Sequence, residues 1–177
     1  MTHENHSTPA TSTSNPPGVP DDGRPDRDPI PPTAVAKLPF HDAAELRERW
    51  RALLGELGFS EPTLWFVFVE RGTQLIPALS TLPLPDTPNR HLMDMLLLRL
   101  GETISATDDL SVACLLTRPG SDGLTARDRG WASMITDAAV RRRVPLLPLF
   151  RANDINVVAV PGAPGGEALP EPLEAAS

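Results

Sequence analysis

The residues best suited to chemistry lie where a predicted strand ends and a predicted helix begins, within ACLLTRPGSDGLTARDRGW at 113–131. Arg118 follows the predicted strand, and Arg127, Asp128 and Arg129 open the predicted helix. Arginine binds phosphate and carboxylate groups through its fork of N–H donors, and a carboxylate beside it can accept a proton. We therefore take these four residues as a candidate surface site, either for an acidic partner or for hydrolysis.

Local structure offers another role for Thr125 and Asp128. Thr-x-x-Asp in front of an apolar run is the sequence of a capping box, in which each side chain bonds the backbone N–H of the other residue. This role needs no ligand, and it accounts for both residues. Glu70 is a further carboxylate, but the surrounding ERGT is typical of a hairpin turn. A hydrolase that uses Glu70, Asp128 and Arg118 is therefore kept as an alternative only.

The same stretch resembles the signature of the JAB/MPN metalloproteases, above all of their bacterial RadC-like branch. That signature is His-x-His-Pro, a short loop of Gly and Ser, and Ser-x-x-Asp at the start of a helix. Here LTRP at 116–119 is followed by GSDGL at 120–124 and TARD at 125–128. In the family the two His and the Asp hold zinc, and an upstream Glu, for which Glu70 is the match, activates a water. The order of predicted elements over 64–160 is similar too, so the resemblance implies a JAB-like fold.

The departures from that signature concern the metal ligands. Leu116 and Arg118 stand where the family has its two His. Leucine has no donor atom, arginine stays cationic, and a catalytic zinc needs about three protein ligands. Asp128 alone does not suffice, so we expect no catalytic residue, no metal and no cofactor. The sequence favours a non-catalytic JAB-like domain that acts by binding a protein or a ligand.

Three further features have simpler explanations than a site. His91 and Asp94 have the spacing of metal ligands on a helix, but no second pair completes a site, and an exposed polar stripe is favoured. Cys114 lies within a predicted strand, where it serves as a small buried apolar residue. The cluster RRR at 141–143 is suited to the negative end of a helix dipole, with contact to phosphate or to an acidic partner as the alternative.

Composition divides the 177 residues into one domain and two tails. Residues 1–37 and 162–177 are rich in Pro, acidic and without apolar periodicity, so we expect disordered tails around a single α/β domain at 38–161. Most of the formal net charge of −7 falls in these tails. The nearly neutral remainder disfavours nucleic-acid binding, although weak binding through Arg residues stays open as an alternative.

The sequence also predicts where the protein works. Its N-terminus lacks a basic start followed by an apolar run, so we expect no signal peptide. The most apolar run, 92–100, contains Asp94 and Arg99 and is too short to span a bilayer. Cys114 is the only cysteine, which excludes an internal disulfide and fits a reducing compartment. We expect a cytoplasmic protein with a protein partner and no membrane contact.

The first two predicted helices have identifiable caps. Residues 41–59 have apolar side chains at helical spacing, with Asp42 and Glu45 as a capping box and Gly58 as the end. Residues 89–100 are apolar around most of the circumference, which predicts a well-buried helix. Asp86 or Thr87 is its expected cap.

The remaining elements complete an α/β pattern. A third helix runs from Thr125 to Arg143, and strands are predicted at 63–70, 74–80, 110–117, 144–150 and 155–160. Pro77 marks the second strand as an edge or bulged strand. The order α-β-β-α-β-α-β-β predicts a mixed sheet of about five strands with helices on both faces. The strands flanking the long helix should be parallel neighbours joined by a right-handed crossover.

Overall fold

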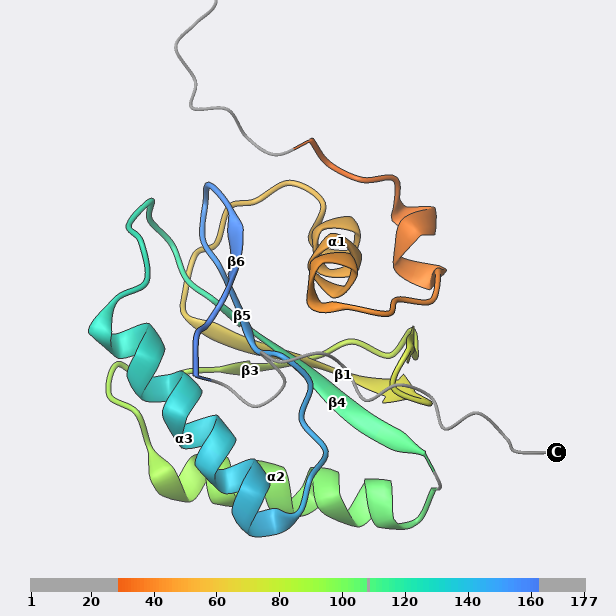
Figure 1. The fold of residues 1–177 in the computed structure, drawn as a ribbon. Coiled ribbons are helices and arrows are strands. Elements are labelled where there is room, and N and C mark those ends of the chain that lie inside the picture. Colours follow the sequence, from red (N-terminus) through yellow and green to blue (C-terminus); the bar gives the residue numbers. More distant parts are fainter. Residues whose placement is uncertain (1–28, 108, 163–177) are drawn as a thin grey trace, which may run out of the picture.

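The computed structural model describes residues 29–107 and 109–162. Its helices and strands follow one another in the order that the apolar pattern predicts, with a short helix added at the start (Figure 1). They are η1 (Thr33–Lys37), α1 (Ala43–Leu54), β1 (Thr63–Glu70), β2 (Gln74–Leu75), β3 (Ser80–Pro83), α2 (Arg90–Ser105), β4 (Leu110–Thr117), α3 (Ala126–Arg142), β5 (Phe150–Ala152) and β6 (Val157–Ala159). The mixed α/β fold predicted from the sequence is confirmed.

The strands form one mixed sheet in the order β2-β1-β4-β5-β6, with β3 also paired to β1. The pair β4 and β5, which flanks the long helix α3, is parallel as predicted, and the other pairs are antiparallel. In the ladder between β1 and β4, Thr63 pairs with Thr117 and Glu70 with Leu110. The start of β1 therefore lies beside the end of β4.

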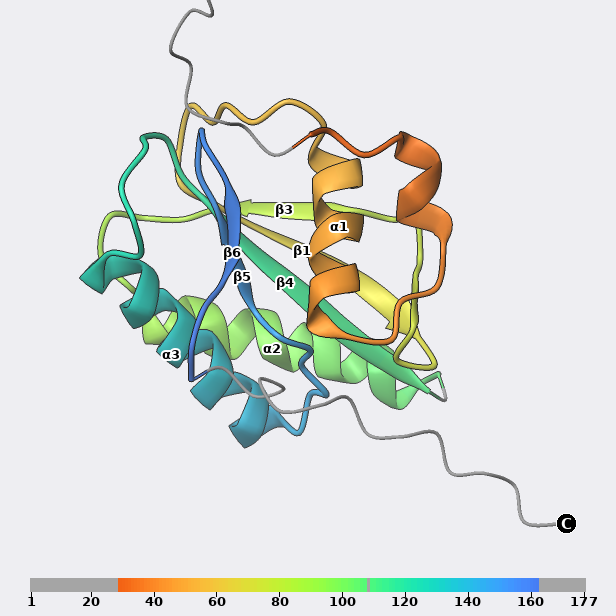
Figure 2. The ribbon, with the colours of Figure 1, turned by 45° about the horizontal axis from the view of Figure 1, so that its top comes forward.

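Helices cover both faces of the sheet, with α1 on one side and α2 and α3 on the other (Figures 1 and 2). Side chains of β4 alternate between the two layers: Leu116 and Cys114 belong to the core under α2 and α3, and Leu115 to the core under α1. All of β4 from Ser111 to Thr117 is buried, which explains its continuous apolar sequence.

The caps of α1 and α2 agree with the sequence in part. Asp42 accepts the backbone N–H of Glu45, as predicted, but the helix ends at Gly55, which has a φ of 66°, and not at Gly58. A positive φ costs glycine nothing, so the first glycine after the last turn ends the helix. For α2 the cap is Asn89, whose side chain accepts the N–H of Leu92, and not Asp86 or Thr87.

Helix α2 is also longer and less buried than predicted. It continues past Leu100 to Ser105, and its buried side chains, Met93, Leu97 and Leu100, lie on one face. Met95, on another face, is 41% exposed. The prediction of a helix buried around most of its circumference is therefore wrong, because a helix in an outer layer contacts the sheet with one side only.

Proline shortens two of the predicted strands. The segment 74–80 gives only β2, and pairing resumes at Ser80 as β3, because Pro77 between them has no N–H for the ladder. Pro145 and Pro148 have the same effect on 144–150, where an isolated bridge at Leu146 precedes β5. Consequently β5 contains Phe150, Arg151 and Ala152, two of which the sequence assigns to a turn.

The folded part begins before the predicted boundary at residue 38. Helix η1, Thr33–Lys37, packs on α1, and its Ala36 is buried. Just after it, the Arg49 guanidinium of α1 donates to the carbonyls of Leu38 and Pro39, at 3.1 and 2.7 Å. The predicted tail 1–37 thus overlaps a packed element, and the rest of the two predicted tails, 1–28 and 163–177, lies outside the described residues.

None of the helices in the described part of the chain has the length and apolar character needed to cross a membrane.

Candidate functional site

The candidate site lies at the carboxyl ends of the parallel strands β4 and β5, where ligands commonly bind in α/β sheets (Figure 1). The chain leaves β4 at Arg118, whose backbone N–H donates to the Ala152 carbonyl at the end of β5. It then loops through 119–125 and enters α3. This topology brings the end of a buried strand, a loop and a helix N-terminus to one place.

Arg118 and Asp128, two of the four predicted site residues, contact each other directly. Nε of Arg118 lies 3.0 Å from Oδ1 and 3.2 Å from Oδ2 of Asp128. Both side chains are largely buried, with 12% and 5% exposed. The pair therefore neutralises its own charges within the fold.

The rest of the Arg118 guanidinium is bound to the loop that follows it. Nη2 donates to the carbonyls of Gly123, at 2.8 Å, and Asp122, at 3.3 Å, and Nη1 donates to the carbonyl of Pro119 at 3.2 Å. Together with the two contacts to Asp128, these bonds engage all three nitrogens of the group. Arg118 thus holds the loop 119–123 in shape.

Asp128 also forms the capping box predicted from the sequence. Its Oδ2 accepts the backbone N–H of Thr125 at 2.8 Å, and the Thr125 hydroxyl accepts the N–H of Asp128 at 3.2 Å. Burial by itself would raise the pKa of the Asp128 carboxyl, but the hydrogen bond from Thr125 and the Arg118 guanidinium outweigh it. The pKa of Asp128 is therefore held below its usual value, and the group is a carboxylate at neutral pH.

Arg127 and Arg129 do not join this pair. Nη2 of Arg127 donates to the Pro85 carbonyl at 3.0 Å and lies 3.2 Å from the exposed carboxylate of Asp86. The Arg129 side chain is exposed, with no hydrogen bond or ion pair to the described residues. Only two members of the predicted set of four thus form a cluster.

The structure adds three residues that the sequence assigns to a turn. Asn153 donates through Nδ2 to the Asp122 carbonyl at 2.9 Å, and Asp154 accepts the N–H groups of Gly120 and Phe59 at 2.7 and 3.0 Å. Both tie the loop after β5 to its neighbours. The signal for them was present, since NDIN directly follows a buried strand, but it also reads as an ordinary turn.

Arg151 is the third added residue, and it is almost completely buried, at 2% exposed. Nη1 lies 3.3 Å from Oδ1 of Asn156, and Nε has no hydrogen-bond partner among the described residues. Burial lowers the pKa of the Arg151 guanidinium, while the charge of Asp128 favours the cation. The Asp128 carboxylate thus forms an ion pair with Arg118 after β4 and also favours the charged form of Arg151 in β5.

Glu70 lies at the opposite end of the sheet. It pairs with Leu110 at the start of β4, whereas Arg118 follows the end of that strand. Seven residue steps of strand separate these two ends, about 23 Å at about 3.3 Å per residue. Glu70, Asp128 and Arg118 therefore do not form one site.

The other sequence candidates have structural roles. The Asp94 carboxylate of α2 accepts from Arg141 of α3 at 2.8 Å and lies 3.6 Å from Nε of Arg90, and its hydrogen bond to Arg141 lowers its pKa. The neighbouring His91 is exposed. No group of three or more His, Cys, Asp or Glu side chains within residues 29–107 and 109–162 is arranged to hold a metal ion.

Arg141 and Arg142 lie in the last turn of α3, as predicted, and Arg143 caps it with a φ of 55°. The Cys114 thiol is buried, and burial raises its pKa to about 12. Cys114 is therefore a packed core residue, as the sequence predicts, and not an accessible nucleophile.

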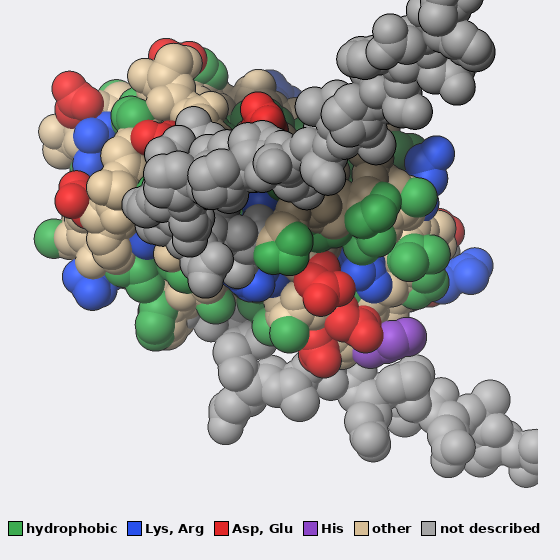
Figure 3. Space-filling view, turned by 90° about the horizontal axis from the view of Figure 1, so that it is seen from above, with side chains coloured by type: hydrophobic (Ala, Val, Ile, Leu, Met, Phe, Trp, Pro, Cys, Tyr) green, Lys and Arg blue, Asp and Glu red, His purple; other side chains and the backbone are tan. Residues whose placement is uncertain are grey.

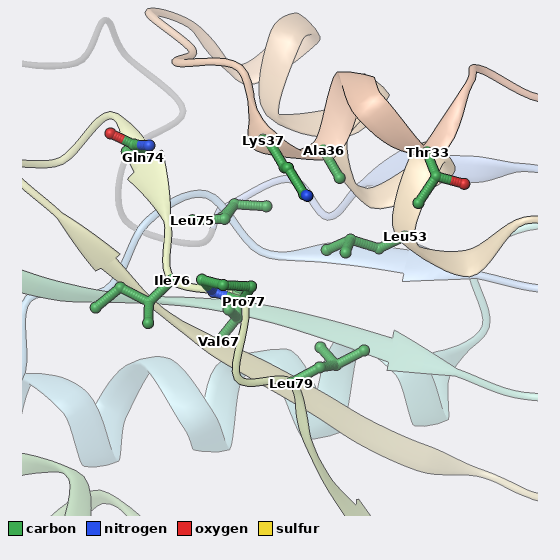
Figure 4. A pocket seen from close by; sticks show the side chains of 10 residues that line it. All are labelled: Thr33, Ala36, Lys37, Leu53, Val67, Gln74, Leu75, Ile76, Pro77 and Leu79. Atoms are coloured by element: carbon green, nitrogen blue, oxygen red, sulfur yellow. The ribbon is translucent and has the colours of Figure 1, made fainter.

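Several cavities among the described residues lie away from the Arg118–Asp128 pair, and two of them bear on function. One, of about 350 Å³, is bordered by Glu61, Trp65 and Thr117 at the end of β4. The other, of about 460 Å³, lies between η1, α1 and the segment that joins β2 to β3 (Figure 4). Neither is lined by Arg118 or Asp128. The pair that the sequence singles out is therefore internal to the fold, and these cavities lie elsewhere.

The visible coloured part of Figure 3, on the side that carries α1, includes side chains of both charges. In this space-filling view, the acidic and basic side chains are interspersed. Nucleic-acid binding relies on a continuous basic footprint.

Comparison of the chain with family models, with curated proteins and with solved structures finds no match.

Proposed function

We propose that this chain is a non-catalytic domain of JAB-like fold that acts by binding. The observation that carries the proposal is the contact between Arg118 and Asp128. Position 118 ends a buried strand and position 128 lies in the first turn of the following helix, which is where the JAB signature places a metal-binding His and Asp. Their side chains lie 3.0 Å apart, and this proximity supports the proposal.

The side chains at these positions do not fit zinc. The Asp128 carboxylate is engaged by the Arg118 guanidinium and by the backbone N–H of Thr125. Leu116, at the place of the other His, is 4% exposed and packs in the core under α2 and α3. A guanidinium thus supplies the positive charge that a metal supplies in the family, and it cannot activate a water as a metal does.

The alternatives receive less support. A hydrolase built on Glu70, Asp128 and Arg118 would need groups from the two ends of the sheet to meet. A weak nucleic-acid binder would need a cluster of free cations, whereas three of the arginines, Arg118, Arg127 and Arg141, are paired with carboxylates. Binding of a protein or a ligand remains the proposal, in the cytoplasm, where the buried thiol of Cys114 stays reduced.

Zinc content tests the proposal. Elemental analysis of the untagged protein should give far less than one zinc per chain, and calorimetric titration with zinc should show no specific binding. The double variant Leu116→His, Arg118→His places two imidazoles beside Asp128 and should gain about one zinc per chain. The single variant Leu116→His is the control, because it retains Arg118 and should not bind.

Two outcomes would contradict the proposal in different ways. Stoichiometric zinc in the unmodified protein would overturn its non-catalytic character. A double variant that unfolds cooperatively, yet binds zinc no better than the control, would overturn the JAB-like geometry.

A further inference from the structure

The cavity between η1, α1 and the segment that joins β2 to β3 has mainly apolar walls and a single charged group. Its walls come from α1 at Leu53, from β1 at Val67 and from the segment 75–79. Figure 4 shows these side chains around a common space, with Lys37 of η1 extending into it from above. The volume of about 460 Å³ falls within the range of small-molecule sites, which is about 300–1,000 Å³.

Lys37 is an unusual group at this place. It is the one lysine among the 16 basic residues of the chain, and no acidic side chain lines the cavity with it. Its ammonium makes no hydrogen bond or ion pair with the described residues, and its nitrogen points toward the space between Leu75, Leu53 and Pro77 (Figure 4). The cavity thus combines apolar walls with an exposed positive charge at its opening, which has no acidic partner among the lining residues.

We infer that this cavity binds a medium-chain monocarboxylate, with the alkyl chain against the apolar walls and the carboxylate at Lys37. A cationic amphiphile would meet the like charge of Lys37. A phosphate or polyanion would meet only one cation, where such ligands call for several donors. The inference rests on the proposed binding function and gives it a ligand class.

Two features set the expected energetics. The apolar chain provides most of the affinity, since each buried CH₂ contributes about 0.8 kcal/mol. Lys37 is exposed, so its ion pair adds at most about 1 kcal/mol, which is about fivefold in affinity. The charge therefore selects the head group more than it tightens binding.

Calorimetric titration of the full chain with decanoate tests the inference. Decanoate should bind with one site per chain, and butyrate, which lacks six CH₂ groups, should bind at least about tenfold more weakly. Decylammonium, with the same chain and the opposite charge, should bind more weakly than decanoate. These three probes separate the contributions of chain and head group.

Two variants locate the site. Leu79→Trp enlarges a side chain on the cavity wall that is 36% exposed, so the fold has room to adjust, and it should abolish decanoate binding. Lys37→Gln removes the charge, and should weaken decanoate about two- to fivefold and leave decanol binding unchanged. Met95→Trp on α2, on the opposite face of the sheet, is the control and should bind decanoate as the unmodified protein does.

Absence of decanoate binding would overturn the inference, and so would binding that neither Leu79→Trp nor Lys37→Gln alters. A dimer in sedimentation that Leu79→Trp dissociates would assign the cavity to a second copy of the chain and overturn it as well. If Leu79→Trp does not fold, the comparison of decanoate with decylammonium and the decanoate affinity of Lys37→Gln still test the inference. None of these results depends on zinc, so failure here leaves the non-catalytic proposal to its own test.

Discussion

Nε of Arg118 and Oδ1 of Asp128 lie 3.0 Å apart and join the end of β4 to the first turn of α3. Both side chains are largely buried, and Asp128 accepts a further hydrogen bond from the N–H of Thr125. Removing one member of a buried ion pair leaves the other charge without compensation, which costs about 3–5 kcal/mol. The stability of the junction should therefore depend on the charge of Asp128.

We expect Asp128→Asn to lower the free energy of unfolding at pH 7 by about 3 kcal/mol, the lower end of that range, because Arg118 keeps its bonds to three carbonyls. The pKa of Asp128 is lowered by folding, so its contribution is present above the unfolded pKa of about 3.9. It is lost as the pH falls through the lower, folded value. Urea unfolding of both proteins at several pH values measures the difference between their free energies of unfolding. This difference should shrink as the pH falls below about 4.

The matched control for this prediction is Asp137→Asn. Asp137 lies on the same helix but is exposed, so the substitution should change stability by no more than about 0.5 kcal/mol. The difference in free energy of unfolding between the Asp128→Asn variant and the unmodified protein could also stay constant from pH 7 to pH 2. That result would show that the charge of Asp128 does not contribute to stability.

Thr125→Ala and Leu116→Ala should both destabilise the protein, by different amounts. Thr125 loses an N-cap hydrogen bond, at a cost of about 0.5–2 kcal/mol. Leu116 is buried between the sheet and α3, and its truncation leaves a cavity that costs about 2–5 kcal/mol. Denaturant midpoints should fall in the order unmodified, Thr125→Ala, Leu116→Ala, and the reverse order for the two variants would refute this account of the junction.

Helix η1 should contribute to the stability of the domain. We compare a chain that begins at residue 29 with one that begins at residue 38. The shorter chain lacks Ala36, which is buried against its neighbours, so its free energy of unfolding should be lower by about 1–2 kcal/mol. Thermal unfolding of both chains measures the difference, and equal midpoints would place the true boundary at residue 38.

Cys114 should not react in the native protein. The thiol is 1% exposed and has a pKa of about 12, so at pH 8 only about one thiol in ten thousand is ionised even where reagent can reach it. Ellman's reagent should release no chromophore from the folded chain over minutes and one equivalent in guanidinium chloride. Rapid release from the folded chain would contradict the burial of β4.

Structural features that depend on residues close together in the sequence, such as helix caps and apolar periodicity, could be predicted from the sequence. The caps at Asp42 and Thr125 involve residues three positions apart, and the apolar patterns of β1, β4 and α3 reflect which faces are covered. Only Thr125 forms the full predicted capping box, because the Glu45 carboxylate accepts the N–H of His41 and not that of Asp42. These are local properties, since hydrogen bonds at a helix end and the spacing of side chains on a helix or strand are set within a few residues. The mixed sheet with helices on both faces followed from them.

The ends of elements were predicted less well, because several residues compete for the same role. Asn89 caps α2 in place of Asp86 or Thr87, and Gly55 ends α1 three residues before Gly58. Each of these residues has a suitable side chain or backbone freedom. Packing of the finished helix on the sheet selects one of them.

What the sequence determined by itself is the series of elements, the capping box at Thr125 and the absence of imidazoles at positions 116 and 118. Only the tertiary structure decided that Arg118 binds Asp128, that Arg151 lies buried beside them and that Glu70 is at the far end of the sheet. It also formed the cavity at Lys37 from segments more than thirty residues apart. The physical reason is that strand register and the packing of distant segments depend on long-range contacts, which no short stretch of sequence specifies.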